Sequence, residues 1–556
     1  MLSVCQRAGM ASQRPVESNR VEKPAAAPLD PDVGVSPHRW WIFAGLWAAA
    51  VMEVLDTTIV NVAMPQMAGN LNATPQEIAW VATGYILSNV VVLPMTAFLA
   101  SVFGRRNYLI GSIALFILAS FFCGIATSLG QMVVWRIIQG AGGAALLSTA
   151  QATLREIFPR AQQGMVQAFF MIGIVVAPTL GPTLGGWITD NYTWGWVFFV
   201  NVPLGLIAMI PVSTYLKDSP FQNPNASRRP DWLGIGLLTV GLASLQYVLE
   251  EGQKDDWFQS EFITRLAVIA GVSLVWLIFW QLSPKNKAPV IDFRVLKNHQ
   301  LRTSLYLFLS LGFGLYGGLF LYPLFTQNIL RLTPTATGLS LLPGGLATIV
   351  GVLICGRLLS GSIADKVDPR VLVFIGVGLF STSMWQLGHL TTATGTDDLT
   401  LSLAIRGLGL GFLFAPINQI AFAGMEPHET QQGAGLISLT RQLGGSFGIA
   451  VLGTHLAGSI KTHQNQLADH LTYGSAALGE RLQGATGLLI GAGNSPADAQ
   501  KAAPAIVQML VDREAAMMAF NNGFQLIFVA FLLAAPMVML LRKPRLGGGP
   551  GGPKGH

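Results

Sequence analysis

Two acidic residues and one arginine lie inside otherwise apolar stretches. Glu53 and Asp56 are three residues apart within 41–66, and Arg136 lies within 132–154. Residues three apart lie on one face of a helix. Charged groups inside a membrane are costly and usually serve a function, and a buried carboxyl group beside an arginine can gain or lose a proton as its surroundings change. These residues therefore indicate proton or cation handling within a membrane.

Each of these residues also has a simpler interpretation. The carboxylates of Asp56 and Glu53 could be held permanently in a salt bridge or in a hydrogen bond that packs helices. Arg136, one to two turns below the expected outer end of its segment, could extend to the lipid headgroups. The sequence leaves both alternatives open.

The elements that position these charges are membrane helices. The 556 residues are 51% hydrophobic and 11% charged, with mean hydropathy +0.50, whereas soluble proteins carry roughly 25% charged residues. A spanning helix needs about 20 mostly apolar residues, and such segments recur fourteen times. We therefore predict an all-α integral membrane protein, not a soluble enzyme. The segments are 41–66, 78–102, 108–126, 132–154, 164–188, 196–216, 232–249, 262–281, 303–326, 337–359, 371–391, 399–424, 433–458 and 520–541.

Lys and Arg are distributed unevenly over the connections. Residues 1–38 lack the apolar core of a cleaved signal, so we expect a disordered cytoplasmic tail. From that start, the six predicted inner loops hold 14 Lys and Arg, whereas the six short outer loops hold 2. Basic residues favour cytoplasmic loops, so this bias predicts a cytoplasmic C-terminal tail at 542–556 and location in the inner membrane. The net charge of +6 thus reflects topology and gives no reason to expect nucleic-acid binding.

The segment 459–519 is the longest connection, and it falls on the outer side. Ala, Leu and Gln recur in it at helical spacing, so we expect a helical hairpin packed over the outer mouth. A flexible polar loop is the alternative.

No metal or cofactor site is expected. Cys5, Cys123 and Cys355 suggest neither a disulfide framework nor a zinc site, and the spacing of His455, His463 and His470 is too long for one metal. No serine triad or nucleotide-binding loop appears in the sequence.

The chain also contains an internal repeat. The motif AFLASVFGRRN after the second segment corresponds to GSIADKVDPR after the tenth, and RIIQG at Arg136 corresponds to IRGLG at Arg406. We therefore expect two six-helix halves, at 39–216 and 303–541, with two extra central helices within 217–302.

Taken together, the motifs resemble the major facilitator superfamily, and within it the fourteen-helix drug:proton antiporters of the EmrB-like type. The motifs are VLDTTIVNVAMP, WVATGYILSN, RIIQGAGG, APTLGPTLGGWITDNYTWGWVFFVNVPLG and LEEGQKDDW. The resemblance spans roughly 40–541 and implies the major facilitator fold.

The resemblance also implies roles for the intramembrane charges. Asp56, in LDTTIVN, matches the membrane acid of these antiporters and is the first choice for the proton or cationic-substrate site, with Glu53 second. The arginine of RIIQG, Arg136, is implied in proton coupling. Arg406 and Arg441 are the second-half candidates, and for Arg441 we expect a structural role.

Two further motifs concern gating. The resemblance implies an antiporter signature in the fifth helix, associated with exporters, formed by Pro178, Gly181, Pro182, Gly185 and Gly186. It also implies a gating motif in the first inner loop, with Gly104, Arg105 and Arg106 present but Ser101 where an acid is usual. The second copy of that motif retains Gly361, Asp365, Lys366 and Arg370.

These features predict a carrier without a cofactor, driven by the proton gradient. It would export lipophilic or amphiphilic drugs by alternating access, in contact with membrane lipids. If the resemblance extends to partners, the long outer segment would meet a periplasmic adaptor and, through it, an outer-membrane channel. Export of a native metabolite such as a siderophore, peptide or sugar is the alternative. A sensor or intramembrane enzyme would require a catalytic constellation or soluble domain, and the sequence shows neither.

Overall fold

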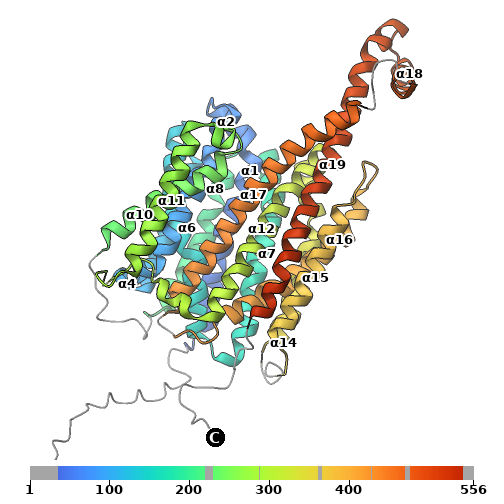
Figure 1. Ribbon diagram of the computed structural model, residues 1–556. Coiled ribbons are helices and arrows are strands. Elements are labelled where there is room, and N and C mark those ends of the chain that lie inside the picture. The colour runs from blue at the N-terminus through green and yellow to red at the C-terminus, as the bar shows by residue number, and fades with distance from the viewer. Residues whose placement is uncertain are drawn as a thin grey trace, which may run out of the picture.

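The computed structural model describes residues 36–218, 230–286, 288–360, 366–426, 429–469 and 476–541, which form a helical bundle (Figure 1). The first half contains α1 (Arg39–Asn70), α2 (Pro75–Ile78), α3 (Trp80–Val92), η1 (Leu93–Met95), α4 (Thr96–Phe103), α5 (Arg105–Gly124), α6 (Leu129–Ile157), α7 (Arg160–Asn191), α8 (Trp196–Phe199) and α9 (Asn201–Tyr215).

The central helices are α10 (Trp232–Glu251) and α11 (Glu261–Leu282), with the short turns η2 (Trp257–Gln259) and η3 (Phe293–Lys297). The second half contains α12 (His299–Asn328), α13 (Pro334–Ser340), α14 (Leu342–Leu358), α15 (Pro369–Leu387), α16 (Thr396–Ala421), α17 (Thr430–Asp469), α18 (Ala476–Gly491) and α19 (Pro496–Leu540).

The predicted spans coincide with these helices. Among the described residues, 12 helices are long and apolar enough to cross a membrane, and α7, bent by 45° after Pro178, makes a thirteenth. The remaining predicted span is α6, which is 29 residues long and therefore about 44 Å in length. Its run of Gly, Ala, Ser and Thr is buried among other helices, so it does not need the apolarity of a lipid-facing helix. The all-α membrane fold is thus confirmed.

The two halves repeat one packing pattern. In the first half α1 packs on α7 and α9, and α6 packs on α3 and α5; in the second half α12 packs on α17 and α19, and α16 packs on α14 and α15. The inserted α10 packs on both α3 and α17. Hydrogen bonds from Gln246 Nε2 to Ser446 Oγ (2.8 Å) and from Trp257 Nε1 to Thr454 Oγ1 (2.9 Å) join this insert to the second half.

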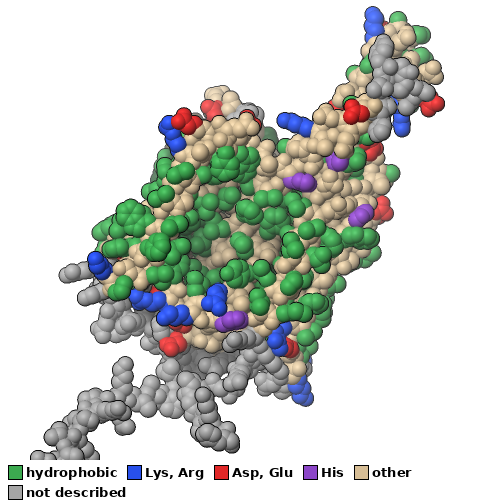
Figure 2. Space-filling model, in the orientation of Figure 1, with side chains coloured by type: hydrophobic (Ala, Val, Ile, Leu, Met, Phe, Trp, Pro, Cys, Tyr) green, Lys and Arg blue, Asp and Glu red, His purple; other side chains and the backbone are tan. Residues whose placement is uncertain are grey.

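The described parts of the predicted inner loops gather at one end of the bundle (Figure 1). Arg105 at the start of α5 pairs with Glu156 at the end of α6, and Asn298 Nδ2 before α12 donates to the Ala423 carbonyl after α16 (3.2 Å). Figure 2 shows apolar side chains covering the flank of the bundle, with charged side chains mostly toward its two ends. This distribution is that of a protein whose flank faces lipid.

The described part of 459–519 is largely helical, as expected, but it does not cover the mouth of the bundle. In Figure 1, α17 and α19 continue past the bundle and α18 lies at the tip of the projection. Gln464 Nε2 of α17 donates to Asp512 Oδ1 of α19 (2.9 Å), and α18 packs on α19 through Ala485, Ala503 and Val507. Because α17 and α19 run on unbroken and support each other, the segment projects away, and the prediction of a cap over the mouth is wrong.

Candidate functional site

Asp56 and Arg136 form an ion pair inside the first half. Arg136 Nη1 lies 2.6 Å from Asp56 Oδ2, and the two residues are 1% and 0% exposed. The pair joins α1 to α6 in the middle of a helix bundle. Arg136 therefore does not extend to the lipid headgroups, which removes the simpler interpretation of this arginine.

Two polar side chains, Gln139 and Asn201, complete the hydrogen bonds of the Asp56 carboxylate, and Ser120 extends the network. Gln139 Nε2 donates to Asp56 Oδ1 (2.9 Å) and to Ser120 Oγ (2.7 Å), and Asn201 Nδ2 also donates to Asp56 Oδ1 (2.7 Å). Arg136 Nη1 in turn donates to Gln139 Oε1 (2.7 Å). The network thus connects α1, α5, α6 and α9. Sequence analysis did not single out these three residues, although Gln139 and Asn201 lie within the family motifs quoted above; nothing in the sequence marks Ser120.

The remaining surroundings of Arg136 come from α3 and α8. Arg136 Nε donates to the Val81 carbonyl (2.9 Å), and the guanidinium lies over the rings of Tyr85 (4.4 Å) and Phe198 (5.6 Å). Aromatic faces attract cations. Gly140, one turn further along α6, packs directly on the Tyr85 backbone, so α3 and α6 approach closely enough to place these groups.

Glu53 has a different environment, although it is one turn from Asp56. It is 7% exposed, and its Oε1 accepts a long hydrogen bond from Asn89 Nδ2 (3.4 Å). Its Oε2 has no partner. The charge of Glu53 interacts with that of Arg441 on α17, in the other half, without ion-pair contact, and Arg441 Nε is likewise buried without a partner. The two candidate acids therefore face different parts of the molecule.

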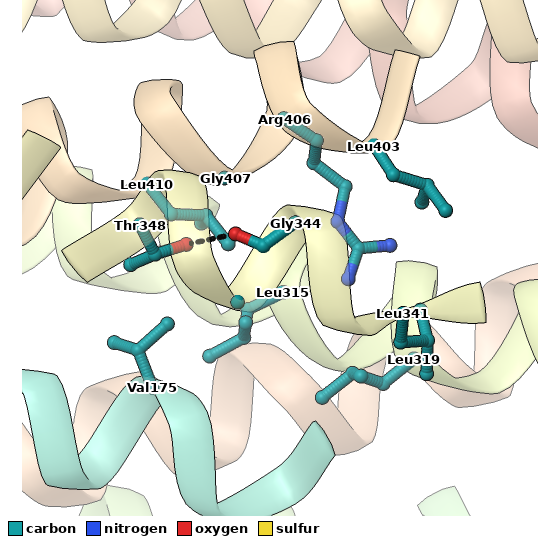
Figure 3. A pocket seen from close by; sticks show the side chains of 11 residues that line it. Val175, Leu315, Leu319, Leu341, Gly344, Thr348, Leu403, Arg406, Gly407 and Leu410 are labelled. Atoms are coloured by element: carbon teal, nitrogen blue, oxygen red, sulfur yellow. Dashed lines mark hydrogen bonds between the residues drawn. The ribbon is translucent and has the colours of Figure 1, made fainter. Parts of the chain in front are cut away.

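Arg406, the second-half counterpart of Arg136, lines a cavity between the halves (Figure 3). The cavity is bordered by Val175 of α7, Leu315 of α12 and Thr348 of α14. The cavity is small, with a volume of about 10 Å³, which is the space that a single water molecule needs. Arg406 is 7% exposed, and its Nη1 is buried without a partner.

The antiporter signature lies where α7 contacts both halves. A Cβ on Gly181 or Gly185 would overlap Thr58 or Ile59 of α1, and one on Gly186 would lie 3.1 Å from Thr335 Oγ1 of α13. Small residues permit such close approach. Pro178 and Pro182 lie inside α7, and the 45° bend follows Pro178, where proline removes a helical hydrogen bond. Signature residues thus lie between α1 and the second half.

The first gating motif makes contacts at the end of the bundle where the loops gather. Gly104 links α4 to α5 with φ of 82°, a conformation that favours glycine. Arg105 pairs with Glu156 (2.6 Å), and Arg106 donates to the Ser213 carbonyl (2.5 Å).

Ser101 and the second copy of the motif complete the comparison. Ser101 Oγ donates within its own helix to the Phe98 carbonyl (2.7 Å), while Asp218, after α9, accepts from the Arg106 backbone N–H (3.0 Å). An acid from another element therefore faces this loop. In the second copy, Arg370 pairs with Asp368 (2.6 Å), whereas Gly361 and Asp365 lie outside the described residues.

The fold and these contacts define a class of protein. Two repeated six-helix halves, with buried charges in membrane helices and a cavity between the halves, are the arrangement of a membrane carrier. Within the described ranges, no three His, Cys, Asp or Glu side chains are placed to hold a metal ion.

Comparison with known proteins identifies the family. The model of the Major Facilitator Superfamily matches residues 46–449. The chain is 35% identical to the multidrug export protein EmrB of Haemophilus influenzae, over 76% of this chain and 81% of that protein. It is 31% identical to the fatty acid resistance protein FarB of Neisseria gonorrhoeae, over 92% and 97% of the two chains. The chain therefore belongs to the Major Facilitator Superfamily, among its EmrB-like multidrug efflux permeases.

A solved structure supports the fold. The crystal structure of a double tryptophan mutant of XylE aligns with a TM-score of 0.58, covering 91% of this chain and 97% of that one. At 12% identity, this likeness concerns the fold alone.

Proposed function

We propose that this permease exports lipophilic or amphiphilic drugs and toxic compounds across the inner membrane in exchange for protons. The relatives named for multidrug export and for fatty acid resistance support an amphiphilic substrate range. The two halves would alternate access to the cavity between them. The proton gradient would supply the energy for export, and no cofactor is required. In this proposal both termini lie on the cytoplasmic side.

The Asp56 network is the observation that carries this proposal. A neutral Asp56 would no longer attract Arg136 by charge, and a protonated oxygen would no longer accept the hydrogen bonds of Gln139 and Asn201 at full strength. Protonation would therefore loosen α1 from α6 and α9. A group whose protonation changes helix contacts is what proton coupling requires.

The contacts of α7 provide a route from that network to the gate. Gly181 and Gly185 pack on α1, whereas Gly186 and Gly338 mark close contacts between α7 and α13. A shift of α1 would therefore change the packing of α7 against the second half. In this proposal, proton binding at Asp56 changes the contact between the halves, and Asp56 itself does not contact the substrate.

Transport in proteoliposomes tests the role of Asp56. With an inward proton gradient, the wild type should export a fluorescent amphiphilic drug, whereas Asp56→Asn should lose gradient-driven export because the side chain no longer titrates. Asp397→Asn, which changes an exposed carboxylate at the start of α16, is the matched control and should export normally. Full gradient-driven export by Asp56→Asn would exclude Asp56 as the coupling residue.

The projecting α17–α18–α19 segment is our candidate contact for a periplasmic adaptor, and through it an outer-membrane channel. It extends beyond the bundle (Figure 1) and so could reach a partner outside the lipid. Photo-crosslinkers placed along α18 should capture the adaptor, and capture from α2 alone would relocate the interface.

A further inference from the structure

The connection between α11 and α12, with the first turn of α12, carries a group of exposed basic side chains. This group, called here the basic connection, consists of Lys285, Arg294, Lys297 and Arg302. None of the four forms an ion pair with another described side chain. The acid among them, Asp292, uses its Oδ1 to accept a hydrogen bond from the Arg294 backbone N–H (2.9 Å). The described side chains therefore leave this surface positively charged.

Apolar residues fix the same connection to the bundle. Val290, Ile291 and Val295 are buried in the main hydrophobic core. Arg294 and Lys297 are three residues apart in η3, and three residues make one turn of a 3₁₀-helix, so they lie on one side of it. Val295 is buried, whereas these two basic residues are exposed. The connection thus holds its apolar side against the protein and presents its basic side outward.

The basic connection lies beside a surface that faces lipid. Only 22% of the apolar stretch of α11 is buried, and this helix packs mainly on α10. The last turns of α11 expose Trp276 and Phe279, and Trp232 is exposed at the start of α10.

These exposed aromatic side chains lie at one end of the helix pair. A hydrogen bond from Trp280 Nε1 of α11 to Asp231 Oδ1 before α10 (2.8 Å) joins the two helices there. Aromatic side chains, tryptophan above all, are enriched where a membrane meets water. Figure 2 shows Lys and Arg side chains along this end of the bundle, next to the apolar flank. The basic connection is therefore placed at the depth of the lipid headgroups.

We propose that the basic connection binds the headgroups of anionic phospholipids such as phosphatidylglycerol. Guanidinium and ammonium groups attract phosphate oxygens by charge and by hydrogen bonding, and the acyl chains would lie along the exposed face of α11. Each basic group near an anionic membrane surface strengthens binding by about fivefold. Because the connection leads into α12, a bound lipid would hold the start of the second half at the surface that we propose to be cytoplasmic. The inference goes beyond the proposed function and does not depend on drug export.

Lipid binding to the full-length protein in detergent, measured by native mass spectrometry, tests the inference. The probes are phosphatidylglycerol and phosphatidylcholine with the same acyl chains, of which only the first has a net negative headgroup. The wild type should bind phosphatidylglycerol about 25-fold or more tightly than phosphatidylcholine. Arg294→Gln combined with Lys297→Gln should lower the affinity for phosphatidylglycerol by about fivefold for each lost charge and leave that for phosphatidylcholine unchanged.

Two further double variants serve as controls. Arg357→Gln combined with Lys366→Gln removes two exposed basic side chains from the second half outside this connection and should bind phosphatidylglycerol like the wild type. Arg294→Lys combined with Lys297→Arg keeps both charges and should retain the preference.

Three outcomes would overturn the inference. Equal binding of the two lipids by the wild type would do so without any variant. An equal loss of affinity in the Gln variant of the basic connection and in the Arg357 and Lys366 control would assign the attraction to basic residues of this end in general. Competition by glycerol phosphate as strong as that by the lipid would make this a site for free phosphate esters. Loss of gradient-driven export in Asp56→Asn concerns the proposed function and would leave lipid binding unchanged.

Discussion

Arg136 and Arg406 lie on corresponding helices of the two halves, but their environments are opposite. Arg136 is paired with Asp56 at 2.6 Å and donates to Gln139 and to the Val81 carbonyl. Arg406 has an unpartnered Nη1 beside an apolar cavity. Both are more than nine-tenths buried. Burial alone therefore does not determine what a membrane arginine does, because the groups that neutralise it differ.

The difference comes from two positions. Asp56 lies nine residues before Pro65 of α1, and the residue nine before Pro323 of α12 is Gly314, which packs against Phe531 and Phe380. Gln139 follows Arg136 by three residues, whereas Gly409 follows Arg406 by three. The second half has thus kept the arginine while lacking its carboxylate and amide partners. In our proposal, proton coupling resides in the first half.

The largest change in the free energy of unfolding is expected when Arg136, the paired arginine, is removed. Arg136→Ala would leave Asp56 buried without its counter-charge, so we expect a loss of about 3–5 kcal/mol in the free energy of unfolding. Unfolding by SDS in mixed micelles measures this change.

A second variant tests the cause of that loss. Asp56→Asn combined with Arg136→Ala removes the orphaned charge and should recover much of the stability while transport stays lost. A single-variant loss below about 1 kcal/mol would mean that the buried pair contributes no more than an exposed one.

The sequence was sufficient to predict the spans and to single out Asp56 and Arg136 as candidates. A membrane span is an apolar run of about 20 residues, so a window of that length moved along the chain detects it. Charges inside such runs are rare enough to be noticed individually. The structure places these two candidate residues in direct contact, as an ion pair between α1 and α6.

The partners of these charges could not be predicted in the same way. Ser120 and Asn201 come from α5 and α9, and their contacts with the Asp56 network depend on how those helices pack. Likewise, Arg406 has no carboxylate partner on α12, because Gly314 occupies the position that corresponds to Asp56 of α1. The sequence predicted helices within 459–519 but gave the wrong direction for the segment. Hydrophobic periodicity shows which face of a helix is apolar, and it does not show where a pair of helices points.

Placing an acid beside the unpaired arginine should abolish the difference between the halves. Gly318→Asp would set a carboxylate next to Arg406 Nη1, where there is space for it. We expect the free energy of unfolding to exceed that of Gly318→Asn, which has the same size without the charge, by about 1.5 kcal/mol, because the carboxylate neutralises the buried guanidinium. Unfolding by SDS in mixed micelles measures the difference. Equal stability of the two variants would show that Arg406 already has a counter-charge.

The smallest change in the free energy of unfolding is expected when Arg406, the unpaired arginine, is made apolar. Its sign should be opposite to that of Arg136→Ala. Arg406→Leu replaces an uncompensated buried charge with a side chain that matches Leu315 and Leu403 of the cavity wall, so unfolding should become harder by about 1 kcal/mol. The same SDS titration measures it, beside Arg136→Ala. If Arg406→Leu instead destabilised the protein as much as Arg136→Ala, Arg406 would have an internal partner in the resting protein, and the difference between the two halves would disappear.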